Sequence, residues 1–217
     1  MTAVPFGTDA DVTAALERVL THLRAGKLLA YPTETVYGLG SRPREHEVRA
    51  LATLKGRASE KPFLLLVGSR EMAEAQGLAF NESARALARA FWPGPLTLVL
   101  PGGSGRLPGL LRGPEGGIAV RWTSHPHVAR LVAALGEPLT STSANRPGTP
   151  PAPGAAAILR DFAHAVEEGR LLVLDGGVLG NRPPSTVVDC TGSAARVIRA
   201  GALSVAQLRA GAGMLAP

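Results

Sequence analysis

Apolar residues along this 217-residue chain repeat with two different periods, and the two periods alternate. Near the N-terminus, Val12, Leu16, Val19, Leu20 and Leu23 follow helical spacing, with Gly26 placed to end the helix. Further helices are expected at 48–56, 81–90, 128–135 and 155–162, the second of them capped by Asn81. Apolar runs predict strands at 27–31, 63–67, 96–100, 118–122, 139–142, 171–174 and 186–189.

Strands that alternate with helices predict a layered α/β domain. The strand that follows Trp92-Pro-Gly-Pro95 is a candidate for antiparallel pairing, so we expect a mixed sheet. The length suits one large domain, 1–217, and no linker or change of composition favours two small ones.

Composition narrows the function classes without choosing among them. The chain is 45% hydrophobic but only 4% aromatic, so Ala, Val and Leu must build the core. No apolar run is long enough to span a bilayer and residues 1–11 hold no signal core, so we expect a cytoplasmic protein with no membrane partner. Cys190 is the single cysteine, which excludes an intrachain disulfide and a cysteine-based zinc site. The net charge of +6 favours an anionic partner, either a nucleotide or RNA.

The segment Tyr31-Pro-Thr-Glu-Thr-Val-Tyr-Gly-Leu-Gly40 follows a short apolar strand and does not look like core. Loops after strands are where α/β proteins present binding groups. Thr33 and Thr35 have the same parity, so their hydroxyls should point the same way. A polar hairpin turn is the alternative, and it is less favoured because the segment is long and specific.

A cationic cluster follows at Lys55, Arg57 and Lys61. The chain has three lysines against twenty arginines, and two of the three lie in this cluster. Ammonium and guanidinium groups this close together suit phosphate oxygens. For Lys55 alone, a basic helix end that complements the helix dipole is a plausible alternative. The usual nucleotide signature G-x-x-x-x-G-K-[ST] is absent, so an ATP site here would need a different cradle.

Four more segments complete an ordered set: Phe91-Trp-Pro-Gly-Pro-Leu-Thr97, Ala119-Val-Arg121, Ser141-Thr-Ser-Ala-Asn145 and Ser185-Thr-Val-Val-Asp189. With the first two motifs, this set resembles the YrdC-like family of threonylcarbamoyl-adenylate synthases over about residues 26–201. Each motif alone is a weak signal, and the order gives it weight. The resemblance implies a twisted, open mixed sheet flanked by helices, a large concave cleft and no additional C-terminal domain.

The resemblance also implies a reaction. L-threonine, bicarbonate or CO₂, and ATP would give threonylcarbamoyl-AMP and pyrophosphate, and separate transfer proteins would use this product to modify tRNA. Mg²⁺ would accompany ATP, held mainly by phosphate oxygens and water. Such a transfer needs positioning and charge stabilisation, so no covalent nucleophile is expected.

The family's roles carry over residue by residue. Lys55 and Arg57 would stabilise the triphosphate, and the ATP-binding set is Lys55, Arg57, Lys61, Ser143, Asn145 and Arg199. The threonine-binding set is Thr33, Thr35, Arg121, Ser141 and Ser185, with Arg121 under the carboxylate. Ser141 and Asn145 have a second interpretation as turn formers. Leu66 and Trp122 depart from the family pattern and leave the shape of the threonine pocket open.

Two other functions fit parts of the sequence. A non-catalytic protein that binds double-stranded or structured RNA would explain the positive charge, although few aromatics are present to stack on bases. Weak RNA binding is also compatible with the synthase interpretation. Carbamoyl-transfer maturation proteins contain a similar domain but are longer and carry cysteine-rich zinc modules, which this chain lacks.

Overall fold

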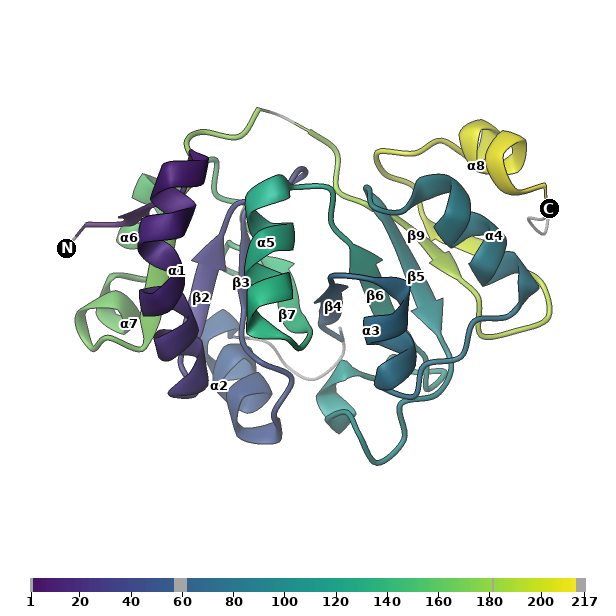
Figure 1. The fold of residues 1–217 in the computed structure, drawn as a ribbon, viewed down its shortest axis with the longest axis horizontal. Coiled ribbons are helices and arrows are strands. Elements are labelled where there is room, and N and C mark those ends of the chain that lie inside the picture. Colours follow the sequence, from purple (N-terminus) through teal and green to yellow (C-terminus); the bar gives the residue numbers. More distant parts are fainter. Residues whose placement is uncertain (1, 57–61, 181, 214–217) are drawn as a thin grey trace.

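A computed structural model describes residues 2–56, 62–180 and 182–213. In the described part, ten strands form a single sheet in the order β1-β8-β2-β3-β7-β4-β6-β5-β9-β10 (Figure 1). The strands are β1 (Val4–Pro5), β2 (Leu28–Tyr31), β3 (Gly38–Gly40), β4 (Leu64–Val67), β5 (Leu96–Leu100), β6 (Ile118–Trp122), β7 (Leu139–Ser143), β8 (Leu171–Asp175), β9 (Thr186–Asp189) and β10 (Arg196–Arg199).

Helices cover the sheet, as the alternating periods predict. They are α1 (Asp9–Arg24), α2 (Glu45–Lys55), α3 (Arg70–Ala75), α4 (Glu82–Phe91), α5 (Pro126–Leu135), α6 (Ala155–Asp161), α7 (Ala163–Glu167) and α8 (Val205–Ala212), with a 3₁₀ turn, η1, at Gly109–Leu111. The Asn81 side chain accepts a hydrogen bond from the amide of Ala84, so the predicted N-cap of α4 is confirmed. None of the helices in the described ranges is long and apolar enough to cross a membrane.

The sheet is mixed, as predicted. Strand β5 runs antiparallel to β6 and parallel to β9, and β4 runs parallel to β6 but antiparallel to β7. The long connections between parallel strands carry the helices. The predicted fold class, a mixed sheet flanked by helices, is therefore confirmed.

Strand β3 corrects the expectation that the segment after the first apolar strand does not belong to the core. Gly38–Gly40 pairs with β2 on one side and β7 on the other, and all three residues are buried. A Cβ atom on Gly40 would lie 2.0 Å from the carbonyl oxygen of Thr140, and the ring of Tyr31 packs over both glycines. The glycines are therefore required by close packing inside a sheet, which their loop-like composition conceals.

Two apolar clusters sandwich the sheet. In β2, Leu29 and Tyr31 join a cluster with α1 and α5, whereas Leu28 and Ala30 join the larger cluster that includes α2, α4 and α6. The sheet is thus buried on both faces here, which explains why β2 is wholly apolar. Helices α1 and α5 lie together over one part of the sheet, and α8 packs against α4 near its other end (Figure 1).

The elements that the periodicity missed are short or exposed. Strand β1 has two residues, and β10 is mostly exposed at an edge of the sheet, so neither carries an apolar pattern. Helix α8 buries only Leu208 of its eight residues.

Candidate active site

A cavity of about 430 Å³ opens over the middle and one end of the sheet. It receives side chains from seven strands or the loops beside them. The lining residues include seven of the predicted site residues, namely Thr33, Thr35, Arg121, Ser141, Ser143, Ser185 and Arg199. Arg57 and Lys61 lie outside the described residues. The remaining wall is largely apolar and includes Pro62, Leu64, Val99, Ala119, Pro184, Val187 and Ile198.

Strand alternation explains how two polar groups reach a cavity from apolar strands. In β5, Thr97 and Val99 line the cavity while Leu96 and Leu98 lie in the core. In β6, Ala119 and Arg121 line the cavity while Ile118 and Val120 lie in the core. Successive side chains of a strand point to opposite faces, so the floor of the cavity is one face of the sheet.

Thr33 and Thr35 both line the cavity, and a bend rather than an extended segment brings their hydroxyls together. The Oγ1 of Thr33 accepts hydrogen bonds from the amides of Thr35 and Val36 and lies 3.1 Å from the Oγ1 of Thr35. A hydroxyl that binds amides two and three residues ahead is typical of a turn. Both threonines are buried, so the loop is held rigidly at the cavity wall.

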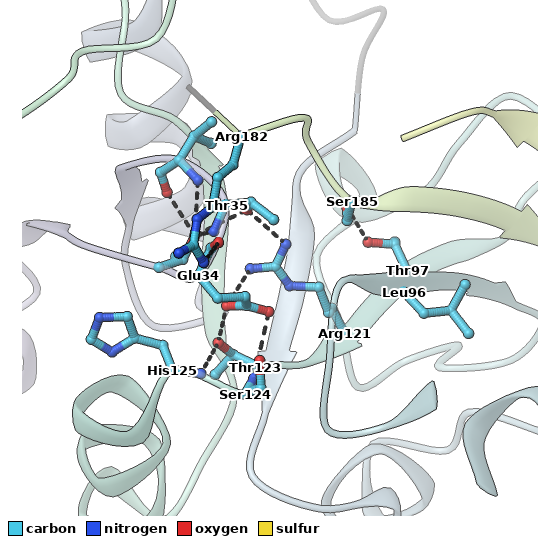
Figure 2. A network of polar contacts seen from close by, with 12 residues as sticks. Glu34, Thr35, Leu96, Thr97, Arg121, Thr123, Ser124, His125, Arg182 and Ser185 are labelled. Carbon is cyan, nitrogen blue, oxygen red and sulfur yellow. Dashed lines mark hydrogen bonds and ion pairs between the residues drawn. The ribbon is translucent and has the colours of Figure 1, made fainter. Parts of the chain in front are cut away.

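Arg121 is the most deeply buried cation that lines the cavity, at 4% exposure. Its Nη2 lies 3.2 Å from the carboxylate of Glu34, and its Nη1 donates to the Oγ1 of Thr35 at 3.2 Å. The same carboxylate accepts a short bond of 2.6 Å from Thr123 (Figure 2). A buried guanidinium requires an anionic partner, and Glu34 supplies one within the protein. Glu34 is a residue that the sequence interpretation did not assign to the site.

Among the described residues, two guanidinium groups line this cavity, those of Arg121 and Arg199. Burial lowers the pKa of Arg121, and the carboxylate of Glu34 partly opposes that effect. Burial also lowers the pKa of Arg199, and the positive charge of Arg121 lowers it further. Two guanidinium groups that repel each other beside one carboxylate favour the arrival of an anion.

Thr97 is a cavity residue that the sequence interpretation did not assign. Its Oγ1 lies 2.8 Å from the Oγ of Ser185, and Arg199 donates from Nη2 to the carbonyl oxygen and Oγ of Ser185 at 2.8 and 3.2 Å. Figure 2 shows the Thr97–Ser185 contact beside Arg121. The available signal was its place as the last residue of the Phe91–Thr97 motif, the only hydroxyl in a strand of leucines and a valine.

Lys55 joins α2 to the loop after β7. Its Nζ donates to the carbonyl oxygens of Ser143 and Asn145 at 2.6 and 2.5 Å and to the Oδ1 of Asn145 at 2.6 Å. The Oγ of Ser143 also donates to that Oδ1. Lys55, Ser143 and Asn145 therefore come together as predicted. In this arrangement Lys55 holds the loop, and its contact with a triphosphate stays a prediction.

Leu66 and Trp122, the two departures from the family pattern, do not line the described part of the cavity. Leu66 is fully buried among apolar residues. The carboxylate of Asp189 caps the end of β9, where it accepts hydrogen bonds from the amide and hydroxyl of Thr191.

Within the described ranges, no three His, Cys, Asp or Glu side chains gather to hold a metal ion.

The fold and the cavity define a class of protein: an α/β protein with a cavity on one face of its sheet, lined by arginines, hydroxyls and an apolar wall. Its family follows from comparison with known proteins. The Sua5, YciO and YrdC family, described as "Telomere recombination", matches residues 21–201. The chain belongs to this family.

Named relatives are similar over most of this chain. The threonylcarbamoyl-AMP synthase of Chromohalobacter salexigens is 42% identical over 181 residues, which cover 83% of this chain and 91% of the relative. The protein of the same name from Pyrococcus abyssi is 36% identical over 187 residues, covering 86% of this chain but 54% of that protein.

Solved structures agree with the fold. The structure of P. abyssi Sua5 complexed with L-threonine has a TM-score of 0.86 at 31% identity, covering 99% of this chain and 62% of that one. E. coli YciO shares the fold with a TM-score of 0.80 at 24% identity, covering 95% of this chain and 97% of that one.

Proposed function

We propose that this chain is an L-threonylcarbamoyladenylate synthase, which converts L-threonine, bicarbonate or CO₂, and ATP to threonylcarbamoyl-AMP and pyrophosphate. The observation that carries the proposal is the cavity itself, where seven of the predicted site residues, from distant parts of the sequence, line one space. Relatives named threonylcarbamoyl-AMP synthase, at 42% and 41% identity, support the same reaction.

The threonine side of the site is Thr33, Thr35, Arg121, Ser141 and Ser185. Arg121 pairs with the threonine carboxylate, and the hydroxyls position the rest of the amino acid. The structure of P. abyssi Sua5 complexed with L-threonine supports threonine as the ligand. The apolar wall near these groups suits the methyl group of threonine, so serine should react less well by about 1 kcal/mol or somewhat more.

The nucleotide side is Lys55, Arg57, Lys61, Ser143, Asn145 and Arg199. The threonine amine takes up CO₂ as a carbamate and releases a proton. A carbamate oxygen then attacks the α-phosphorus of ATP, and pyrophosphate leaves. The cations hold the phosphates in line and offset their charge, which is the main requirement of phosphoryl and nucleotidyl transfer. Mg²⁺, bound by the phosphates and water, would supply further charge neutralisation.

The product would pass to tRNA-modifying transfer proteins in the cytoplasm. An RNA-binding protein without catalysis is not favoured, since the relatives are named as enzymes. A non-catalytic RNA-binding protein would show salt-dependent RNA binding with no ATP turnover.

The test is an incubation of the protein with threonine, bicarbonate and ATP labelled at the α-phosphate. We expect pyrophosphate and a labelled adenylate that both require threonine and bicarbonate. Pyrophosphate release at the same rate without an amino acid would show an ATPase instead. Serine in place of threonine measures the contribution of the methyl group.

A further inference from the structure

A chain of three polar side chains lies at the cavity wall: Thr97 on β5, Ser185 just before β9, and Arg199 at the end of β10. Ser185 is in the middle. Its Oγ accepts from the Nη2 of Arg199 at 3.2 Å and lies 2.8 Å from the Oγ1 of Thr97. Thr97 and Ser185 are almost completely buried, at 1% and 2% exposure, whereas Arg199 is exposed.

Hydrogen counting limits how this chain can be arranged. Each hydroxyl has one hydrogen to donate and two lone pairs to accept with. Arg199 only donates, so it occupies one lone pair of Ser185. One hydrogen joins Thr97 to Ser185, and one hydroxyl hydrogen is left over. Neither hydroxyl has another hydrogen-bond partner among the described residues, and both side chains line the cavity, so the remaining hydrogen is available to a group bound there.

The charge of Arg199 selects the arrangement once an anion is bound. A hydroxyl that accepts from a cation becomes a stronger donor, because hydrogen bonds in a chain polarise one another. Ser185 therefore donates to the anion, and Thr97 donates to Ser185. Arg121, on the neighbouring strand β6, faces the same space.

We infer that Thr97 is a positioning residue for substrate binding, which directs the hydroxyl hydrogen of Ser185 to the carboxylate of the amino-acid substrate. The inference rests on the proposed function, since it takes threonine as that substrate. A purely structural role would be met as well by valine, which has the same shape and an equal preference for strands. The other residues of β5 are apolar, so the strand itself does not need a hydroxyl.

The experiment measures threonine binding by calorimetry for the wild type, Thr97→Val, Thr97→Ser, Ser185→Ala and the double variant Thr97→Val/Ser185→Ala. Thr97→Val should weaken binding roughly threefold to tenfold, which is the value of one net hydrogen bond. Thr97→Ser should restore it to within about twofold, because serine keeps the donor. The double variant should bind no more weakly than Ser185→Ala, because Thr97 acts only through Ser185.

Thr140→Val is the matched control. Thr140 is a buried strand hydroxyl that bonds the amide of Ser41 and does not line the cavity. It should lose stability but keep threonine affinity. Thermal unfolding is recorded for every variant, and Thr97→Ala replaces Thr97→Val if the latter does not fold.

The outcomes separate the two levels of the argument. A wild type that does not bind threonine overturns the proposed function and the inference with it. If the wild type binds threonine and Thr97→Val binds it equally tightly, the inference is overturned but the proposed function is not. Additive losses in the double variant also overturn it, because they would mean that Thr97 acts independently of Ser185.

Discussion

Replacing Glu34 with glutamine tests whether the cavity depends on an internal counter-charge for Arg121. The substitution keeps the shape and one acceptor oxygen but removes the negative charge that lies 3.2 Å from the guanidinium. The exposed fractions of the two side chains are only 5% for Arg121 and 13% for Glu34, so water screens the pair weakly. The change therefore leaves a buried cation without its partner.

The expected loss follows from the burial. Removing one partner of a buried pair typically costs about 3–5 kcal/mol, and the retained oxygen places Glu34→Gln near the lower value, about 3 kcal/mol. For a domain of this size, each kcal/mol lowers Tm by about 2–4 °C, so Tm should fall by about 6–12 °C. Urea unfolding and thermal scans measure both quantities.

A control pair keeps the test specific. Arg49 and Glu45 form an ion pair of 2.7 Å on α2 with side chains 69% and 51% exposed. Glu45→Gln should change the unfolding free energy by less than about 0.5 kcal/mol, because exposed pairs contribute little. If Glu34→Gln were as mild as Glu45→Gln, the pairing of Glu34 with Arg121 would not stabilise the fold and this reasoning would be refuted.

Three further predictions follow from the same contacts. Arg121→Lys should weaken threonine binding nearly as much as Arg121→Ala, since lysine lacks the planar fork and each charge-assisted hydrogen bond is worth roughly 1.5–3 kcal/mol. Calorimetry with ATP should show little change in ATP affinity. A loss of ATP affinity alone would assign Arg121 to the phosphate side of the site. Lys55→Met should lower the unfolding free energy by about 2 kcal/mol, because it removes the hydrogen bonds that a charged ammonium makes to partly buried oxygens of Ser143 and Asn145; unchanged unfolding in urea would contradict this. His125→Asn should reduce the loss of stability between pH 7.5 and 5.5. Burial and the neighbouring His127 hold the pKa of His125 below its ordinary value, although Glu34 opposes them, so the unfolded chain binds the proton first and stability falls as the pH drops below about 6.5. An unchanged difference in urea midpoint between the two pH values would exclude this residue as a cause.

The sequence by itself determined most of the element types and seven of the cavity residues. Apolar periodicity is local, so the helix capped by Asn81 and strands such as β5 and β6 could be predicted from neighbouring residues alone. The family resemblance carried by the motifs assigned seven residues that line the cavity.

The tertiary structure alone decided which of these residues touch. Glu34 meets Arg121, 87 positions away, and Lys55 meets the loop at Ser143, 88 positions away. Both contacts depend on strand order, which local spacing does not encode. The same holds for β3, whose glycines are buried because β7 and the ring of Tyr31 fill the space where side chains would be. Periodicity reports which face of an element is apolar, and only the packed sheet determines what lies against that face.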